Sequence, residues 1–422
     1  MKMLSDTIIQ PPPRPRILLI SCNYAPEPNG TGKYNGEMIN WLAANGYDCT
    51  VITTCPYYPE WKVQPPYDKN KYRYRKEAAG DHVTIYRCPQ YVPTKPSGKM
   101  RMLQDFSFTL SAGWKLIQLL TRSRFDIVIT VVPSFHLGLL AVLYKKLRHA
   151  RFLYHIQDMQ IEAARDLQMI RSRWLLSRLF RIEQYIFRQA DTITSISDGM
   201  IRKIQQKAGK PIQLLPNWVD IQRYHPLDDR DTLKKAYGFH TTDKVVLYSG
   251  AIGEKQGLEA ILHAARALRE QAQLKFLICG SGPYQARLHA LAHSWQLNNI
   301  SFLPLQPAAH FNRFLNMADV HLVIQKGHAA DLVMPSKLTT IMAVGGLALI
   351  TANEGTSLHT LVQQHEIGML VKADDQQQLN EGILRAVHTP PPHIARNARR
   401  YAENHLSVEK IMSDFTSLIQ QS

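Results

Sequence analysis

The chain has 422 residues, of which 45% are hydrophobic and 20% are charged. These values exclude a largely disordered protein, and the length predicts two domains because a single hydrophobic core rarely grows beyond about 250–300 residues. Fifty Lys and Arg against 34 Asp and Glu give a net charge of +16, which indicates an anionic partner but does not choose among nucleic acid, lipid head groups and phosphorylated substrates.

The N-terminal residues 1–14 hold a proline cluster and no apolar core segment, so we expect a flexible tail there and no secretory signal. The most apolar window, 136–144, is too short to span a membrane. Five cysteines occur without any Cys-x-x-Cys pair, namely Cys22, Cys49, Cys55, Cys88 and Cys279. They predict reduced thiols in a cytoplasmic protein without a metal site.

The first predicted strand, 16–21, is followed by a glycine turn at Gly30 and Gly32 and by a helix over 33–45. This order is typical of a βαβ unit, in which backbone N–H groups at the helix start can bind an anion. A tight turn without a ligand is the alternative, because glycine tolerates unusual backbone angles. A dinucleotide fingerprint is not formed, since it needs a glycine where Asn35 stands.

Basic residues are mixed with aromatic and aliphatic ones between 99 and 148, and again between 171 and 181. Such mixing is typical of a segment at a membrane interface. It predicts that the N-terminal half docks on an anionic membrane. The alternative is that the apolar side chains pack inward beneath a solvated charged face.

A strand-like run over 151–157 ends in polar groups, with His155 and Gln157 in the run and Asp158 directly after it. Side chains at this end of a strand are expected near a ligand cleft, although a histidine with a structural role is the common alternative. The segment Thr194–Ser197 is expected to be a strand end and a helix N-cap without chemistry.

The second half repeats the plan of the first, with a strand over 245–249, a glycine loop over 250–257 and an amphipathic helix over 258–268. Further strand-like runs, separated by helical stretches, lie at 276–279, 300–303, 320–324 and 348–351. The alternation predicts an α/β protein of two Rossmann-like, doubly wound domains that face a central cleft. We expect an N-terminal domain over 15–217, a hinge over 218–243, a C-terminal domain over 244–400, and a C-terminal helix over 401–422 that packs back on the first domain.

Two lysines of the second half lie beside helix starts. Lys255 is inside the glycine loop, and Lys337 follows Ser336 just before a helical pattern. Together they predict a clamp on an anionic diphosphate. A solvated lysine on an exposed turn is the alternative for Lys255.

Six stretches carry further motifs: Asn23–Tyr34, Pro56–Trp61, His155–Asp158, Leu215–Trp218, Tyr248–Glu259 and Leu332–Thr339. Through them the chain resembles the retaining glycosyltransferases of family 4, which have the GT-B fold. The resemblance covers about residues 16–415. It implies that the C-terminal domain binds a nucleotide sugar, GDP- or UDP-linked, that the N-terminal domain binds the acceptor, and that neither a cofactor nor a metal is needed.

The resemblance also implies roles for single residues. As donor-binding residues it indicates Gly30, Gly32, Gly250, Gly253, Lys255, Gly280, Ser336, Lys337 and Leu338, and as acceptor-binding residues Asn29, Lys33, Tyr34 and Asp158. His155 is expected to contact the transferred sugar, and Lys255 and Lys337 to neutralise the departing diphosphate. His155, Lys337 and Asp331 form the predicted catalytic set.

The chain departs from the family pattern at two places. Ala251 stands where many members have an arginine, and the usual pair of glutamates eight positions apart is absent, since Thr340 occupies the second position. We expect Asp331 to supply the remaining carboxylate. Recognition of the sugar hydroxyls must therefore differ from the common scheme.

The resulting hypothesis is a glycosyltransferase of bacterial exopolysaccharide biosynthesis of the colanic acid type, with fucose as one candidate sugar. Its acceptor would be a polyprenyl-diphosphate-linked glycan, and the protein would lie peripherally on the inner face of the cytoplasmic membrane. Alternatives are a sugar-nucleotide epimerase of the same fold and a basic protein that binds lipid or nucleic acid. No zinc pattern or RNA-recognition signature favours nucleic acid.

Overall fold

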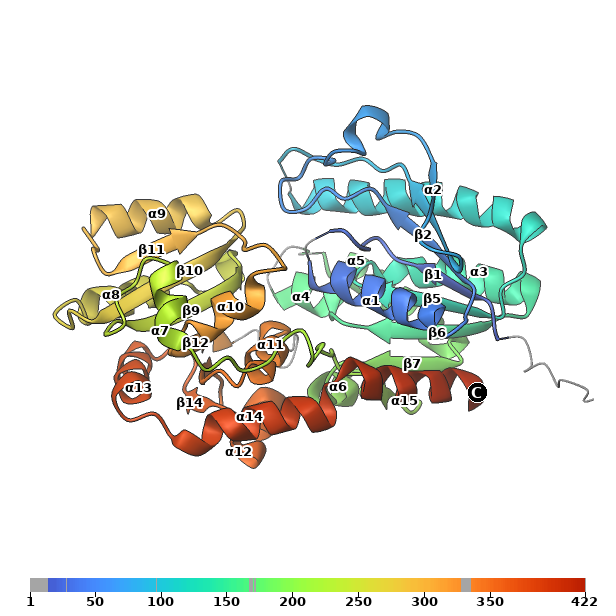
Figure 1. Ribbon diagram of the computed structural model, residues 1–422. Coiled ribbons are helices and arrows are strands. Elements are labelled where there is room, and N and C mark those ends of the chain that lie inside the picture. Colours follow the sequence, from blue (N-terminus) through green and yellow to red (C-terminus); the bar gives the residue numbers. More distant parts are fainter. Residues whose placement is uncertain are drawn as a thin grey trace, which may run out of the picture. The chain divides into compact units, whose positions relative to one another are not determined.

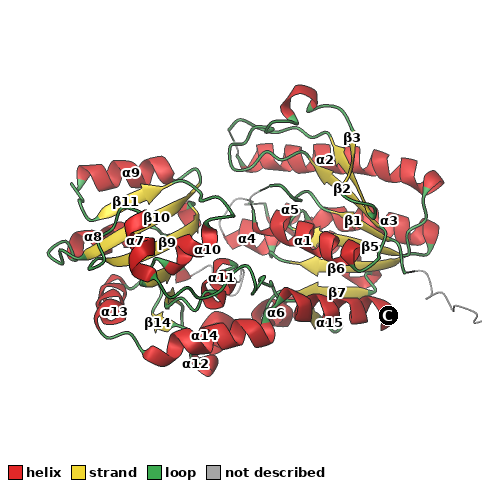
Figure 2. Ribbon diagram, in the orientation of Figure 1, coloured by secondary structure: helices red, strands yellow, loops and turns green. Residues whose placement is uncertain are grey.

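The structure is a computed structural model, and it describes residues 14–27, 29–95, 97–166, 170, 172–327 and 335–421. Helices and strands alternate through most of these segments, and the helices lie along the sheets (Figure 1 and Figure 2). By internal contacts the chain divides into two compact units. One comprises residues 1–155 and 177–193, and the other comprises residues 156–176 and 194–422.

The first sheet has eight strands in the order β3-β4-β2-β1-β5-β6-β7-β8. Their bounds are β1 Ile17–Ile20, β2 Cys49–Thr54, β3 Arg75–Ala78, β4 Val83–Cys88, β5 Ile127–Val132, β6 Arg151–Ile156, β7 Thr192–Ser195 and β8 Gln213–Leu214. Strand β1 is parallel to β2 and β5, whereas β3 is antiparallel to β4. All residues of β1 and β5 are buried, as expected for central strands covered on both faces.

The helices around this sheet follow individual strands. They are α1 Gly30–Ala44, α2 Gly98–Arg122, α3 Gly138–Arg148, α4 Gln160–Asp166, α5 Arg173–Gln189 and α6 Asp198–Ala208, with short 3-10 turns at Asp68–Asn70 and Phe135–Leu137. Helix α1 begins at Gly30 rather than at the predicted residue 33, because the Asn29 side chain accepts a hydrogen bond from the Gly32 N–H at 2.7 Å and caps the first turn. Ser197 caps α6 in the same way, as predicted.

The second sheet has six strands in the order β11-β10-β9-β12-β13-β14. They are β9 Lys244–Ala251, β10 Leu274–Ser281, β11 Ile300–Leu303, β12 Val320–Val323, β13 Ala348–Thr351 and β14 Met369–Val371, and all pair in parallel. The accompanying helices are α7 Arg230–Ala236, η3 Glu254–Gln256, α8 Glu259–Ala267, α9 Gln285–Ser294, α10 Phe311–Asn316, α11 Lys337–Ala343, α12 Ser357–His365, α13 Gln376–His388, α14 Pro392–His405 and α15 Val408–Gln421.

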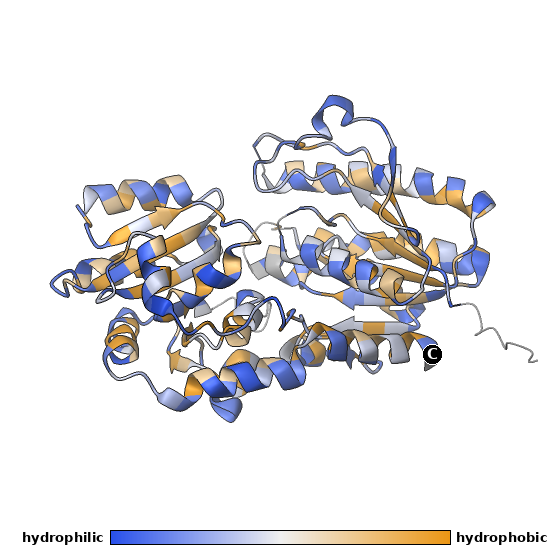
Figure 3. Cartoon of the chain, viewed as in Figure 1, coloured by the Kyte–Doolittle hydropathy of each residue, from blue (hydrophilic) through white to orange (hydrophobic). Residues whose placement is uncertain are grey.

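The second sheet separates two apolar clusters. Along β9, Val245 and Leu247 belong to one cluster, and Val246 and Tyr248 belong to the other. This alternation follows from the two-residue period of a strand. The buried central strands of both sheets are accordingly coloured as hydrophobic in Figure 3, and helices lie along them.

These observations confirm the predicted α/β class with two doubly wound sheets, which are parallel apart from the antiparallel edge strand β3. Among the described residues, no helix is long and apolar enough to cross a membrane.

Candidate functional site

In the second unit, the carboxyl ends of β9 and β10 approach each other so closely that only glycine fits. Gly250 and Gly280 are partners in the parallel register, with φ of +149° and +157°. A Cβ on Gly280 would lie 1.9 Å from the Gly250 carbonyl oxygen. Two residues further along the chain, a Cβ on Gly282 would lie 2.2 Å from the carbonyl oxygen of Ile252. These glycines leave bare backbone at the sheet edge where ligands of doubly wound folds bind.

Lys337, the first residue of α11, brings a cation to this edge. Its Nζ lies 3.5 Å from the ring centroid of Tyr248, and a Cβ on Gly250 would lie 3.0 Å from it. The Nζ is buried and has no hydrogen-bond partner among the residues that the structure describes. Burial lowers the pKa of Lys337 to about 7. A buried cation beside glycine backbone is suited to an anionic group of a ligand.

The other predicted donor residues have different environments. Ser336 is exposed, whereas Leu338 is buried and its N–H donates to the Pro335 carbonyl at 3.0 Å. Gly253 precedes the 3-10 turn that contains Lys255. The side chain of Lys255 and the whole of Asp331 lie outside the described residues.

In the first unit, the predicted glycine turn forms the start of α1. Gly30 and Gly32 are both helical, so unusual backbone angles do not explain them. Gly32 is a glycine because a side chain fits poorly there, since a Cβ would lie 3.0 Å from the Glu27 carbonyl oxygen. Asn29 is partly exposed at the same helix start.

The neighbouring acceptor residues divide into exposed and buried ones. The Nζ of Lys33 lies 4.0 Å from Glu37 and 5.1 Å from the Tyr34 ring centroid. Tyr34 itself is buried, so its side chain packs in the core rather than toward solvent. Asp158 follows β6 and is partly exposed.

His155 lies next to the end of β6, and only 4% of its surface is exposed. Burial lowers its pKa to about 3, so the imidazole is neutral at physiological pH. A neutral imidazole can donate and accept hydrogen bonds with sugar hydroxyls, but it cannot neutralise a diphosphate.

A polar cluster in the first unit was not predicted. Ser134 has a left-handed backbone with φ +69°, and its hydroxyl lies 3.2 Å from Cys22 Sγ and 3.4 Å from Asp105 Oδ1. His136 lies two residues beyond, and burial lowers its pKa to about 4. Left-handed non-glycine residues often mark functional sites. The sequence signal was the Pro133-Ser134 pair directly after a buried strand.

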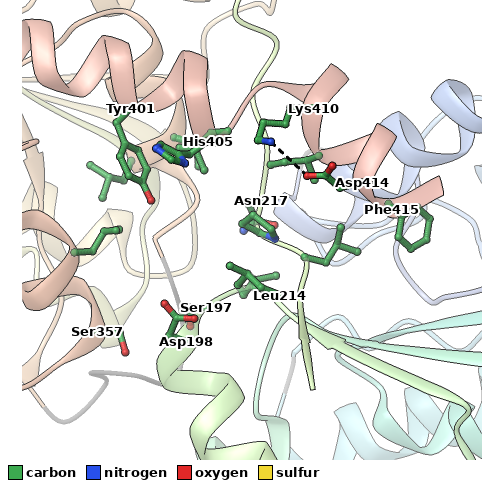
Figure 4. Close-up of a pocket in the computed structure, with 18 of the residues that line it drawn as sticks. Ser197, Asp198, Leu214, Asn217, Ser357, Tyr401, His405, Lys410, Asp414 and Phe415 are labelled. Carbon is green, nitrogen blue, oxygen red and sulfur yellow. Dashed lines mark ion pairs between the residues drawn. The ribbon is translucent and has the colours of Figure 1, made fainter. Parts of the chain in front are cut away.

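A cavity of about 410 Å³ lies within the second unit (Figure 4). Its lining includes Leu338 and Met342 of α11, Tyr401 of α14, and an ion pair of 3.7 Å between Lys410 and Asp414 of α15. Leu338 is the predicted donor residue in this lining, and it contributes an apolar side chain. We therefore do not assign the cavity to the nucleotide sugar.

Comparison with known families matches both halves of the chain. Residues 29–218 match the glycosyl transferase 4-like domain, and residues 229–405 match the glycosyl transferases group 1. The colanic acid biosynthesis glycosyl transferase WcaI of Escherichia coli strain K12 is 38% identical over 413 residues, which are 96% of this chain and 100% of that protein. The N-acetyl-alpha-D-glucosaminyl L-malate synthase of Bacillus anthracis is 21% identical over 95% of this chain and 96% of its own.

Solved structures share the fold over almost the whole chain. Sucrose-phosphate synthase of Thermosynechococcus elongatus superposes with a TM-score of 0.74 at 17% identity, covering 97% of this chain and 99% of that one. Anabaena HepE in complex with UDP and glucose gives 0.72 at 14% identity, covering 97% and 100%. The fold is thus GT-B, and the chain belongs to the family 4 glycosyltransferases, which join a 4-like domain to a group 1 domain.

Proposed function

We propose that this chain transfers a sugar from a nucleotide diphosphate sugar to a lipid-linked glycan in a colanic acid-like exopolysaccharide pathway, with retention of anomeric configuration and without a metal. The observation that carries the proposal is the buried Lys337 ammonium beside Gly250. The name of the Escherichia coli relative supports the pathway, and the UDP complex of HepE supports a nucleotide donor. GDP and UDP remain the two candidate nucleotides, and fucose is one candidate sugar.

In this proposal the donor diphosphate lies against the glycine backbone of β9 and β10. Negative charge on the diphosphate grows as the bond to the sugar breaks, so a fixed cation stabilises the transition state more than the ground state. Lys337 supplies that cation, and Lys255 adds a second. His155 hydrogen-bonds the transferred sugar, and Asp331 supplies a carboxylate for its hydroxyls.

Changing Lys337 to Ala tests the role of this cation. We expect kcat/KM to fall about 30-fold or more, because a charge-assisted contact in a desolvated site contributes about 2 kcal/mol or more. Activity is measured as sugar transfer with UDP- and GDP-sugars, and NMR of the product reports the anomeric configuration. Lys275→Ala is the matched control, since the Lys275 ammonium donates to a carbonyl in an exposed turn of the same unit. A Lys337→Ala variant with wild-type transfer would refute the assignment.

The lipid-linked acceptor is proposed on the basis of an exposed apolar stripe on α2. Leu103, Phe106, Leu110, Trp114 and Ile117 are spaced by three and four residues and are 47–60% exposed, so they share one helix face. Phe108, Leu116 and Leu119 of the same helix are buried. Inward packing therefore accounts for only part of the apolar residues between 99 and 148.

The neighbouring helix α3 contacts α2 and adds Leu139, Leu143 and Leu147, which are also exposed. Contiguous apolar surfaces of this kind mark interaction sites. Exposed basic residues lie in the same segment, namely Lys99, Arg101, Arg122, Arg124 and Lys146. Apolar side chains flanked by basic ones fit the inner face of a bacterial cytoplasmic membrane, where each engaged Lys or Arg contributes about 1 kcal/mol.

Replacing Phe106, Leu110 and Trp114 together by Ser tests the membrane proposal. The wild type should co-sediment with anionic vesicles, less strongly at high salt, and the triple variant should lose most of this binding. Leu305→Ser is the control, because Leu305 is 45% exposed and lies in the second unit. Binding that is absent in the wild type, or equal on neutral vesicles, would refute the proposal that this surface docks on an anionic membrane.

A further inference from the structure

Arg87 of β4 is a buried cation that donates hydrogen bonds to three residues of the first unit. Only 2% of its surface is exposed. Its Nε donates to Glu77 Oε2 at 2.9 Å, its Nη1 donates to the Thr54 carbonyl at 3.0 Å, and its Nη2 donates to the Ala25 carbonyl at 2.8 Å. A buried guanidinium is tolerated only when it is paired and hydrogen-bonded in this way.

Two of these acceptors belong to different loops. Thr54 ends β2, and Ala25 lies between β1 and α1. Strands β1 and β2 are parallel neighbours, so both loops leave the sheet at the same edge. The planar guanidinium thus joins the loop before the α1 glycine turn to the loop after β2.

Glu27 joins the same two loops a second time. It is 3% exposed. Its Oε2 accepts from Asn23 Nδ2 at 3.0 Å, and its Oε1 accepts from the Tyr58 N–H at 2.9 Å. Asn23 belongs to the loop after β1, and Tyr58 to the loop after β2. The buried carboxyl group of Glu27 and the buried guanidinium of Arg87 therefore both hold residues 23–27 in place.

The start of α1 packs on that segment without spare room. A Cβ on Gly36 would lie 2.7 Å from the Ala25 Cβ, and a Cβ on Gly32 would lie 3.0 Å from the Glu27 carbonyl oxygen. Asn35 of α1 also donates to the Asn23 carbonyl at 2.8 Å. Because both helix and segment are packed this closely, a shift of residues 23–27 moves the glycine turn with it.

We infer that Arg87 and Glu27 are positioning residues that fix the glycine turn at Gly30 and Gly32 for sugar transfer. The inference rests on the proposed function and on the donor- and acceptor-binding roles that the family resemblance implies for residues of this turn. Neither side chain needs to touch a substrate. Displacing a binding loop by a fraction of an ångström to one ångström is sufficient to slow a reaction strongly.

The variant Arg87→Lys keeps the positive charge but cannot bridge both carbonyls. We expect kcat to fall about tenfold or more, and amide hydrogen exchange over residues 22–35 to accelerate. Loss of nucleotide-sugar binding by calorimetry should be only partial, because Lys255 and Lys337 of the second unit keep their proposed diphosphate contacts while the turn with Gly30 and Gly32 moves. Glu77→Gln is the matched control, since it weakens an ion pair of Arg87 and leaves both carbonyl bonds in place.

A folded Arg87→Lys protein with wild-type kcat and wild-type amide exchange would overturn the inference. It would also be overturned if Glu77→Gln lost as much kcat, and as much melting temperature, as Arg87→Lys. If Arg87→Lys fails to fold, Glu27→Gln provides the second test. In that variant the new side-chain amide would face the Asn23 Nδ2 donor. We expect a lower kcat and faster amide exchange over residues 22–35, and unchanged values would overturn the inference. If the wild type transfers no sugar, the proposed function fails, whereas the exchange data still decide whether the two residues hold the turn.

Discussion

Lys337 illustrates how the surroundings of one residue define its chemistry. The family pattern often has an arginine at the position of Ala251. Here the Tyr248 ring lies under the Lys337 ammonium, and the Tyr248 hydroxyl donates to the Ala251 carbonyl at 2.7 Å. An aromatic face stabilises a cation above it when no anion is bound. The contact between Tyr248 and Lys337 is one that the sequence motif alone did not reveal.

The lowered pKa of Lys337 predicts that donor binding depends on pH. The free ammonium loses its proton as the pH rises through about 7, whereas a bound diphosphate favours the charged form. The affinity for a nucleotide sugar should thus fall up to about tenfold per pH unit above that value. Calorimetric titrations between pH 6 and pH 9 measure this slope, and Lys337→Arg, which stays charged, should remove it. An equal slope in both proteins would contradict the assignment.

At the level of elements, many buried strands and the glycine-bounded helices were predictable because each has a local signature. The strand expected over 245–249 is Lys244–Ala251, and the helix expected over 33–45 is Gly30–Ala44. Strands β4, β5, β8 and β14 were not predicted, and neither was β3. It is an edge strand whose charged residues Arg75, Lys76 and Glu77 have the pattern of a polar loop, and charge is a common protection for sheet edges.

Contacts between distant residues could not be predicted in the same way. The cluster of Cys22, Asp105 and Ser134 draws on three elements, and the partners of Arg87 lie 10, 33 and 62 positions away. The motif predicts that Tyr34 binds the acceptor. The burial of Tyr34 could not be read from the motif, because it depends on how α1 packs. The hinge over 218–243 and the other domain boundaries stay predictions.

For the molecule as a whole, the buried His155 and His321 and the partly buried His136 predict sensitivity to acid. Burial lowers the pKa of His155 and His321 to about 3 and that of His136 to about 4. In the unfolded chain each titrates near 6.5, so the unfolded state binds protons first as the pH falls. Stability is therefore full above about pH 6.5 and decreases below it by up to about 1.4 kcal/mol per pH unit for each histidine.

Melting temperatures measured from pH 7 to pH 4.5 test this expectation. His321→Gln should reduce the slope of the unfolding free energy against pH by the contribution of about one proton, because a neutral amide replaces a buried base. His310→Gln is the control, since His310 is exposed. If the two variants lose stability with the same pH dependence as the wild type, burial of His321 does not drive the acid response.

The strand orders also bear on how the chain is made. Each sheet has its first-made strand, β1 or β9, in the interior, and nearly every later strand pairs with one that precedes it in the chain. Strand β3 is the exception, because its partner β4 follows it directly. During synthesis on the ribosome, every later strand except β3 therefore emerges when a neighbour is already available, and the sheets can grow outward in both directions without opening pairs that have already formed.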